Sequence, residues 1–177
     1  MQRVNLDGDT HMKKEDKALP IRIGMAEMVI SKTPATIITT VGSCIALCMY
    51  DPVIKIGGMV HIVLPNNLFP SKEKEIKQKY AETAVMALFS ALISEGADKE
   101  RIRAKIAGGA NMFLKLGLKC EALDIGGNNA KMTKKKLAEL HIPLIAEDIG
   151  GNHARRIKFD TDSGRMTVII GEEVKVI

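Results

Sequence analysis

The sequence predicts a single strand-rich domain that also contains two helices. Its 177 residues are the length of one globular domain, or of one domain with a tail. From Ile21 onward, short β-branched segments alternate with turn residues, which is typical of strands. One longer stretch has apolar residues at the three- and four-residue spacing of a helix, and a second helix is expected after a capping residue.

The domain is expected to begin near Ile21. Residues 1–20 are polar and have no apolar period, so they are predicted to form a loosely ordered N-terminal extension, and residues 21–177 the domain itself. Four strands are expected first, at 21–28, 36–40, 44–50 and 58–64. An Asp-Pro pair and a Gly-Gly pair flank the link between the last two strands, which favours a hairpin there.

The second half is expected to alternate between helices and strands. Ser71 can cap a helix that Gly96 ends, and Asn128 can cap a second helix that reaches about Leu140. Short strands are expected at 104–107, at 119–125 and near 144–146, and a C-terminal hairpin at 156–160 and 165–170.

One motif occurs twice, as Asp-Ile-Gly-Gly-Asn-Asn-Ala-Lys from Asp124 and as Asp-Ile-Gly-Gly-Asn-His-Ala-Arg from Asp148. Paired glycines followed by a capping residue and a base could hold an anion on exposed backbone amides. The alternative is two strand ends that turn where only glycine fits. Neither copy has the full spacing of a nucleotide-binding loop, so both interpretations stay open.

Composition limits the possible partners and the compartment. The net charge of +5 comes from bases that mostly alternate with acids, and only 3% of residues are aromatic, so nucleic-acid binding is not expected. No apolar run is long enough to span a bilayer or to act as a signal peptide, so the protein is expected in the cytoplasm, with no membrane insertion. Its three cysteines would stay reduced there.

Cys44 and His61 are the candidate reactive residues. Cys44 directly follows a Gly-Ser turn that can expose the sulfur and its neighbouring amides, and His61 is the one imidazole in an apolar strand. In a hairpin centred between residues 53 and 54, His61 lies opposite Ala46 and diagonal to Cys44 on one face of the sheet. A register shift of one residue would move His61 to the other face.

An imidazole can generate a thiolate, so Cys44 and His61 are a candidate nucleophile and base. The hydroxyl of Thr39 or Thr40 could hold the ring in the productive tautomer. Two alternatives stay open. The pair can be a core cysteine and a satisfied core histidine, or Cys44, Cys48 and His61 can bind a metal, although no fourth ligand is evident.

Four segments in the same order resemble the CheD family of chemoreceptor glutamine deamidases. They are Gly-Ser-Cys-Ile-Ala-Leu-Cys-Met-Tyr-Asp-Pro (42–52), Gly-Gly-Met-Val-His-Ile-Val-Leu-Pro (57–65), Lys-Ile-Ala-Gly-Gly-Ala-Asn-Met-Phe (105–113) and Ala-Glu-Asp-Ile-Gly-Gly-Asn (146–152). The resemblance implies an α+β fold of the cysteine-hydrolase type, with layered β-sheets packed together and flanking helices.

The resemblance also implies an activity and its residues. Cys44 would match the family nucleophile, His61 its base, and Thr39, in preference to Thr40, the third residue. The implied substrates are glutamine side chains of methyl-accepting chemotaxis receptors, hydrolysed through a thioester without metal or organic cofactor. Backbone amides of the Ser43–Cys44 turn would then stabilise the oxyanion.

The resemblance further implies a groove for a receptor helix and an interaction with the phosphatase CheC. Phe113 is a candidate apolar anchor for the helix, with an ordinary core position as the alternative. A non-catalytic adaptor that binds receptors or CheC is the alternative to a deamidase.

Overall fold

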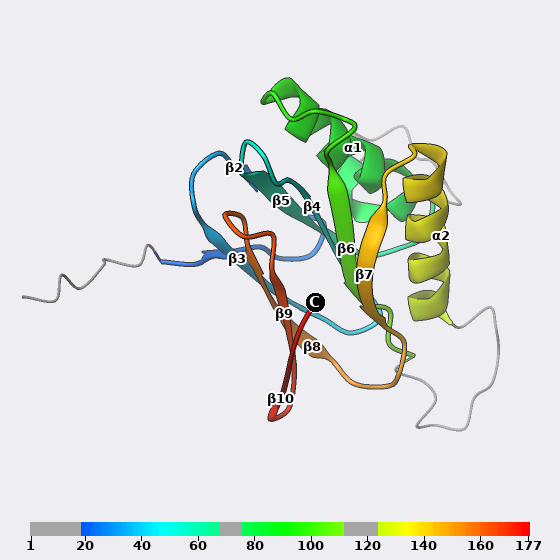
Figure 1. Ribbon diagram of the computed structural model, residues 1–177. Coiled ribbons are helices and arrows are strands. Elements are labelled where there is room, and N and C mark those ends of the chain that lie inside the picture. Colours follow the sequence, from blue (N-terminus) through cyan, green and yellow to red (C-terminus); the bar gives the residue numbers. More distant parts are fainter. Residues whose placement is uncertain (1–18, 68–75, 112–123) are drawn as a thin grey trace, which may run out of the picture.

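The computed structural model describes residues 19–67, 76–111 and 124–177, which form two packed sheets with two helices outside them (Figure 1). The first sheet has the order β1-β3-β8-β9-β10 and the second β2-β5-β4-β6-β7. In the first sheet the strands are β1 (Ile21–Arg22), β3 (Thr36–Val41), β8 (Arg155–Asp160), β9 (Met166–Ile170) and β10 (Glu173–Val176). In the second they are β2 (Met28–Ser31), β4 (Ile45–Asp51), β5 (Ile56–Ile62), β6 (Arg103–Gly108) and β7 (Leu144–Ile149).

The layers run first sheet, second sheet, helices. Helices α1 (Ala81–Ser94) and α2 (Ile125–Glu139) cover the outer face of the second sheet, and the 3-10 turn η1 (Lys77–Lys79) precedes α1 (Figure 1). The two sheets face each other across a separate cluster that includes Ile37, Ala46, Cys48 and Phe159. The described part of the chain is therefore α+β with layered sheets, as the resemblance implied.

The alternation of small and aliphatic residues explains why the second sheet is buried on both faces. In β4, Ile45, Leu47 and Met49 pack against the helices, while Ala46 and Cys48 face the first sheet. All of these residues are fully buried, and all seven residues of β5 are buried as well. A strand covered on both sides reads as a continuous apolar run, so a polar residue such as His61 in it requires a specific partner.

The predicted hairpin and its register are confirmed. β4 and β5 pair antiparallel, and Ala46 lies opposite His61. The strand predicted at 21–28 is wrong in part, because the chain turns between β1 and β2, where Ala26 has a φ of 59°. The short strand β10 was not predicted, and its four residues are all exposed.

The helix starts differ from prediction. Ser71 lies outside the described residues, and α1 begins only at Ala81, after η1. Asn128 is inside α2 rather than its cap. The cap is Asp124, whose carboxylate accepts a hydrogen bond of 3.0 Å from the amide of Gly127. An aspartate three residues before a free amide satisfies that donor better than a residue already within the first turn. Of the strand predicted at 119–125, only the end is described, and Ile125 there is helical.

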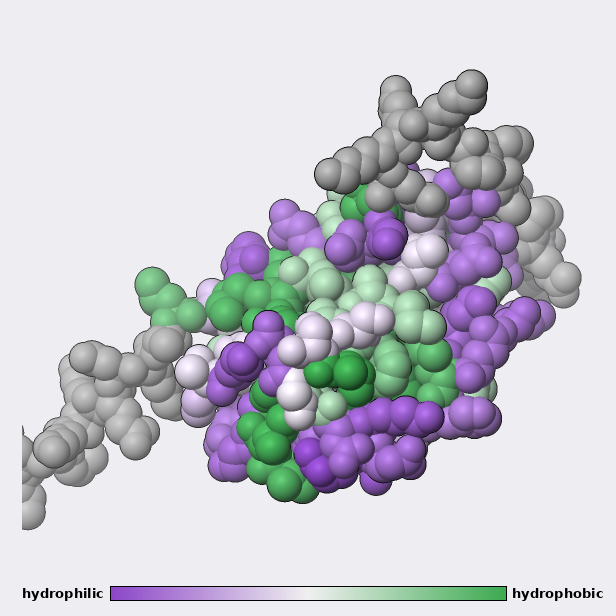
Figure 2. All heavy atoms as spheres, turned by 90° about the horizontal axis from the view of Figure 1, so that it is seen from above, coloured by the Kyte–Doolittle hydropathy of each residue, from purple (hydrophilic) through white to green (hydrophobic). Residues whose placement is uncertain are grey.

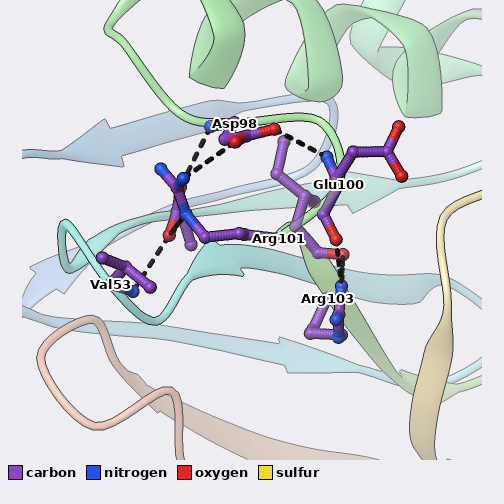
Figure 3. Close-up of polar contacts among 7 residues, drawn as sticks. Val53, Asp98, Glu100, Arg101 and Arg103 are labelled. Carbon is purple, nitrogen blue, oxygen red and sulfur yellow. Dashed lines mark hydrogen bonds and ion pairs between the residues drawn. The ribbon is translucent and has the colours of Figure 1, made fainter.

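A buried carboxylate fixes the far end of the hairpin to the loop before β6. Asp51 is fully buried and accepts hydrogen bonds from the amides of Val53 and Asp98, both at 2.9 Å, and from the guanidinium of Arg101 (Figure 3). Burial alone would raise the pKa of Asp51, but these hydrogen bonds lower it to about 2. The ionised form is therefore the one that the fold stabilises.

Asp51→Asn is expected to lower the free energy of unfolding at neutral pH by roughly 2–3 kcal/mol, because it removes the charge that the backbone amides and the Arg101 guanidinium share. The folded pKa lies below the unfolded one, so the wild-type contribution is complete above about pH 4 and is lost as the pH falls toward about 2. Urea unfolding at several pH values measures both effects. Asp162→Asn, which breaks an exposed pair with Lys55, is the control and should cost less than about 0.5 kcal/mol. Equal losses in the two variants would contradict the role of Asp51.

Candidate active site

A hydrogen bond between the two sheets joins His61 and Thr39. His61 comes from β5 of the second sheet and Thr39 from β3 of the first, and each is only 4% exposed. The Oγ1 atom of Thr39 lies 2.9 Å from Nδ1 of His61. Thr40, the alternative third residue, is exposed, because successive residues of β3 point to opposite faces. The structure therefore places Thr39, and not Thr40, against the ring.

The partners of Thr39 determine the tautomer of His61. The Thr39 hydroxyl also lies 2.9 Å from the backbone oxygen of Ile23, which can only accept. The single hydroxyl hydrogen is used in that bond, so Nδ1 of His61 has to donate its own hydrogen to Oγ1. In the neutral ring the other nitrogen, Nε2, then carries a free electron pair. Nε2 is buried and has no hydrogen-bond partner among the described residues.

The surroundings keep the His61 ring neutral. Burial lowers its pKa below the ordinary value, and only the charge of Glu27 acts in the opposite direction. The backbone of Glu27 also holds the strand, because its carbonyl accepts a hydrogen bond of 3.0 Å from the amide of His61. A neutral imidazole with an unpaired Nε2 is the form that can accept a proton.

Cys44 stands in the turn directly before β4 and is half-buried. It packs against the cluster between the sheets, next to Ala46 and Cys48, and so on the face to which His61 belongs. Burial raises the pKa of the Cys44 thiol, and its own backbone amide acts in the opposite direction. No hydrogen bond joins the Cys44 thiol to Nε2 of His61. Cys44 lies one residue before the paired Ile45, so continuing the register sets it diagonal to His61, and burial favours the neutral form of each side chain.

The backbone leaves no room for a side chain beside Cys44. The carbonyl of Cys44 accepts a hydrogen bond of 2.9 Å from the amide of Gly109. At Gly108, which has a φ of 121°, an added Cβ would lie 2.1 Å from the same carbonyl oxygen. Glycine at position 108, the last residue of β6, is therefore required by the close approach of two backbones.

A cavity of about 480 Å³ opens onto His61. It is lined by Thr39, Thr40 and His61 and by the segment between β1 and β2, which supplies Met25 and Glu27. Met25 is 70% exposed at its edge. A larger cavity, of about 740 Å³, lies between α2 and residues 64–67 and contains none of the predicted site residues.

The two described cysteines bear on the core and metal alternatives for this site. Cys44 and Cys48 are free thiols, and Cys48 is fully buried in the core. The described residues contain no group of three or more His, Cys, Asp and Glu side chains arranged to hold a metal ion. Neither described helix is long and apolar enough to cross a membrane. Phe113, the candidate anchor, lies outside the described residues.

Sequence reasoning missed the carbonyl of Ile23, the acceptor that sets the tautomer of His61. A backbone acceptor has no signature in the sequence, and Ile23 comes next to the ring only through the turn between β1 and β2.

Comparison with known proteins identifies relatives across most of the chain. The family profile described as "CheD chemotactic sensory transduction" matches residues 63–169. A probable chemoreceptor glutamine deamidase CheD of Moorella thermoacetica is 40% identical over 163 residues, which cover 91% of this chain and 97% of that protein. The chemoreceptor glutamine deamidase CheD of Thermotoga maritima is 42% identical over 82% of this chain and 88% of its own.

The chemoreceptor glutamine deamidase CheD of Halalkalibacterium halodurans is 40% identical over 84% of this chain and 91% of that protein. Among solved structures, the hypothetical protein YfiH of Bacillus licheniformis matches with a TM-score of 0.43 and 15% identity, over 68% of this chain and 49% of that one.

The tautomer and the charge of His61 can be measured directly. Two-dimensional ¹⁵N–¹H spectra of the ring are expected to show hydrogen on Nδ1, because Oγ1 of Thr39 can only accept from it. The ring should protonate with a pKa below that of free histidine, since burial disfavours the cation. Hydrogen on Nε2, or a His61 pKa above that of free histidine, would contradict the assignment.

Proposed function

The chain belongs to the CheD family, and from that premise we propose that it hydrolyses glutamine side chains of chemoreceptors to glutamate. Three relatives at about 40% identity are named chemoreceptor glutamine deamidases. The observation that carries the proposal is the free Nε2 of a neutral, tautomer-fixed His61 on the sheet face that also holds Cys44. An unpartnered basic nitrogen beside a cysteine is what a thiol hydrolase requires.

The first half of the proposed reaction forms a thioester. Rotation of the Cys44 side chain brings the sulfur toward His61, and Nε2 takes the thiol proton as the sulfur attacks the amide carbon of the glutamine. The carbonyl oxygen becomes an oxyanion, for which the Cys44 amide is the proposed donor. The C–N bond then breaks, and the proton on Nε2 passes to the departing nitrogen, which leaves as ammonia.

The second half restores the enzyme. Water attacks the thioester carbon and gives a proton to Nε2 of His61. The C–S bond breaks, the receptor keeps a glutamate carboxylic acid, and the thiolate recovers its proton from the ring. Thr39 holds Nδ1 throughout and stabilises the imidazolium that forms twice in the cycle.

Burial of both groups favours a general-base mechanism over a preformed ion pair. Burial raises the pKa of Cys44 and lowers that of His61, and each shift favours the neutral form. The thiol therefore loses its proton to His61 only as the sulfur bonds to the substrate carbon. The rate should fall below the pKa of His61, where the ring becomes protonated.

Turnover is tested by incubating wild type and Cys44→Ala with a receptor cytoplasmic fragment. Wild type should release ammonia and raise the mass of the fragment by about one dalton per glutamine, and Cys44→Ala should do neither. Thr39→Val should reduce kcat by roughly 10- to 100-fold, because the ring loses the acceptor that fixes its tautomer. Cys48→Ala, at the neighbouring buried cysteine, is the matched control and should keep turnover. Equal ammonia from wild type and Cys44→Ala would leave only an adaptor role toward receptors or CheC.

The receptor segment is proposed to enter through the cavity at His61. Apolar side chains gather where the described chain begins (Figure 2). Leu19, Ile21 and Met25, from this part of the chain, are exposed. Met25 is part of the cavity wall itself. An exposed apolar group at the mouth of a site is a natural contact for the apolar face of a receptor helix.

Met25→Asp is expected to raise KM for the receptor fragment about tenfold and to leave kcat within about twofold, because it replaces an apolar contact by a charge. Met86→Asp is the control, since Met86 is an exposed methionine of α1 and does not line the cavity. Steady-state ammonia release gives both constants. An unchanged KM in Met25→Asp would place receptor entry elsewhere.

A further inference from the structure

A side chain from the helix layer reaches the turn that carries Cys44. Asn129 is fully buried on α2. Its Nδ2 donates one hydrogen bond to the backbone oxygen of Ser43 and another to that of Val63, both at 2.9 Å. Ser43 immediately precedes Cys44, and Val63 follows His61 by two residues. One amide group therefore ties the turn of the candidate nucleophile to the strand of the candidate base.

The hydrogen bond from Asn129 to the Ser43 carbonyl orients the whole Ser43–Cys44 peptide group. The carbonyl of Ser43 and the N–H of Cys44 belong to the same peptide group, and in a trans peptide they point in opposite directions. The described residues contain no cis peptide. Since the carbonyl points to α2, the N–H of Cys44 points away from the helix layer, toward the space between the sheets where Cys44 packs.

The two carbonyls on either side are held by backbone alone. The oxygen of Gly42 accepts from the amide of Ala110 at 2.8 Å, and that of Cys44 from the amide of Gly109 at 2.9 Å. Three successive carbonyls of the turn are thus each fixed from outside it. Only the middle one, that of Ser43, is held by a side chain and can be released by a substitution.

Both copies of the repeated motif contribute to this support. The first copy supplies Asn129. In the second copy the amide of Gly150 donates to Gly108 at 3.0 Å, and the oxygen of Gly151 accepts from Asn111 at 2.8 Å, which supports the loop that holds Gly42 and Cys44. The motif therefore builds the scaffold of the turn, where the sequence had left an anion site and a tight turn as alternatives.

The chemistry of the contact requires an amide. Both hydrogens of Nδ2 are used on carbonyl oxygens, which accept only, so the orientation of the group is fixed. Its Oδ1 is buried and has no hydrogen-bond partner among the described residues.

From these contacts we infer that Asn129 is a positioning residue: it sets the orientation of the Ser43–Cys44 peptide group and aims the Cys44 N–H at the oxyanion of amide hydrolysis. This role rests on the proposed function, because it concerns a charge that develops only when an amide or thioester is attacked. Formation of the thiolate by His61 does not depend on it.

Two reactions of Cys44 distinguish stabilisation of the oxyanion from formation of the thiolate. Hydrolysis of the receptor glutamine passes through an oxyanion, whereas alkylation of the sulfur by iodoacetamide does not. Asn129→Ala removes both hydrogen-bond donors. Asn129→Asp replaces Nδ2 by a carboxylate oxygen, which cannot donate to the carbonyl oxygens of Ser43 and Val63. Each variant should lower kcat roughly 10- to 100-fold and change KM less than about twofold. The alkylation rate at Cys44, followed by peptide mass, should stay within about twofold of wild type.

The control variants lie on the same helix. Thr133→Val removes a fully buried hydroxyl that bonds only to the helix backbone, at 2.8 Å from the oxygen of Asn129. Leu137→Ala opens a gap in the core, since Leu137 is 1% exposed, and lowers Tm at least as much as Asn129→Ala does. Both controls should keep kcat within about twofold at a temperature where they are folded.

Two results would overturn the inference. One is a kcat in the Asn129 variants that matches the controls. The other is a parallel fall of kcat and alkylation, which would mean a general loosening of the turn.

The inference can also be judged without turnover. If wild type released no ammonia, the proposed function would fail, and the orientation of the Cys44 N–H would then be read from its residual dipolar coupling. Asn129→Asp should change that coupling and Thr133→Val should not. The same coupling in wild type and both variants would refute the role of Asn129.

Discussion

The candidate site depends on one hydrogen bond that crosses between two sheets. Thr39 and His61 belong to different sheets, and each is buried, so their contact exists only when the sheets are packed in one relative position. The carbonyl of Ile23 takes the hydroxyl hydrogen and thereby leaves Nδ1 as the donor. The packing of the sheets thus brings together Oγ1 of Thr39, Nδ1 of His61 and the Ile23 oxygen, and these three atoms determine the tautomer and the basicity of the ring.

The inter-sheet space explains the electrostatics of the pair. A residue between two apolar layers is poorly solvated, which disfavours charge on both the thiol and the imidazole. An exposed thiol and imidazole would have pKa values nearer the ordinary ones and would exchange protons with solvent instead of with each other. Partial burial therefore favours a proton transfer that accompanies attack on a substrate.

The turn before β4 shows how a flexible sequence becomes a rigid site. Gly42 and Ser43 carry little conformational preference of their own, yet the carbonyl oxygens of the turn are held by the amides of Gly109 and Ala110, directly after β6, and by Asn129 of α2. Glycine is needed at position 108, the end of β6, because two backbones approach closely there. Two parts of the chain distant from the turn thus position a segment that is locally flexible.

The sequence predicted well what depends on local pattern. Strand positions, the hairpin of β4 and β5, and the pairing of Ala46 with His61 follow from alternation and turn residues, which act over a few positions. The preference for Thr39 came from family resemblance, and the structure places it against His61 by packing β3 over β5.

Contacts between distant segments could not be predicted. Ile23 and Asn129 reach the site through contacts across 16 and 86 residues of sequence, and neither has a residue type that indicates a role. The cap of α2 was missed because two residues of the motif, Asp124 and Asn128, are both good caps, and only the geometry of the first turn distinguishes them.

The central claim is that the free Nε2 of His61 takes the proton of Cys44. The most direct measurement is the rate of Cys44 alkylation by iodoacetamide between about pH 5 and pH 9, in wild type and in His61→Ala. The account predicts that wild type reacts faster near neutrality, with a rise at the pKa of His61, and that His61→Ala follows the titration of an isolated buried thiol. Superimposable profiles of the two proteins would contradict it.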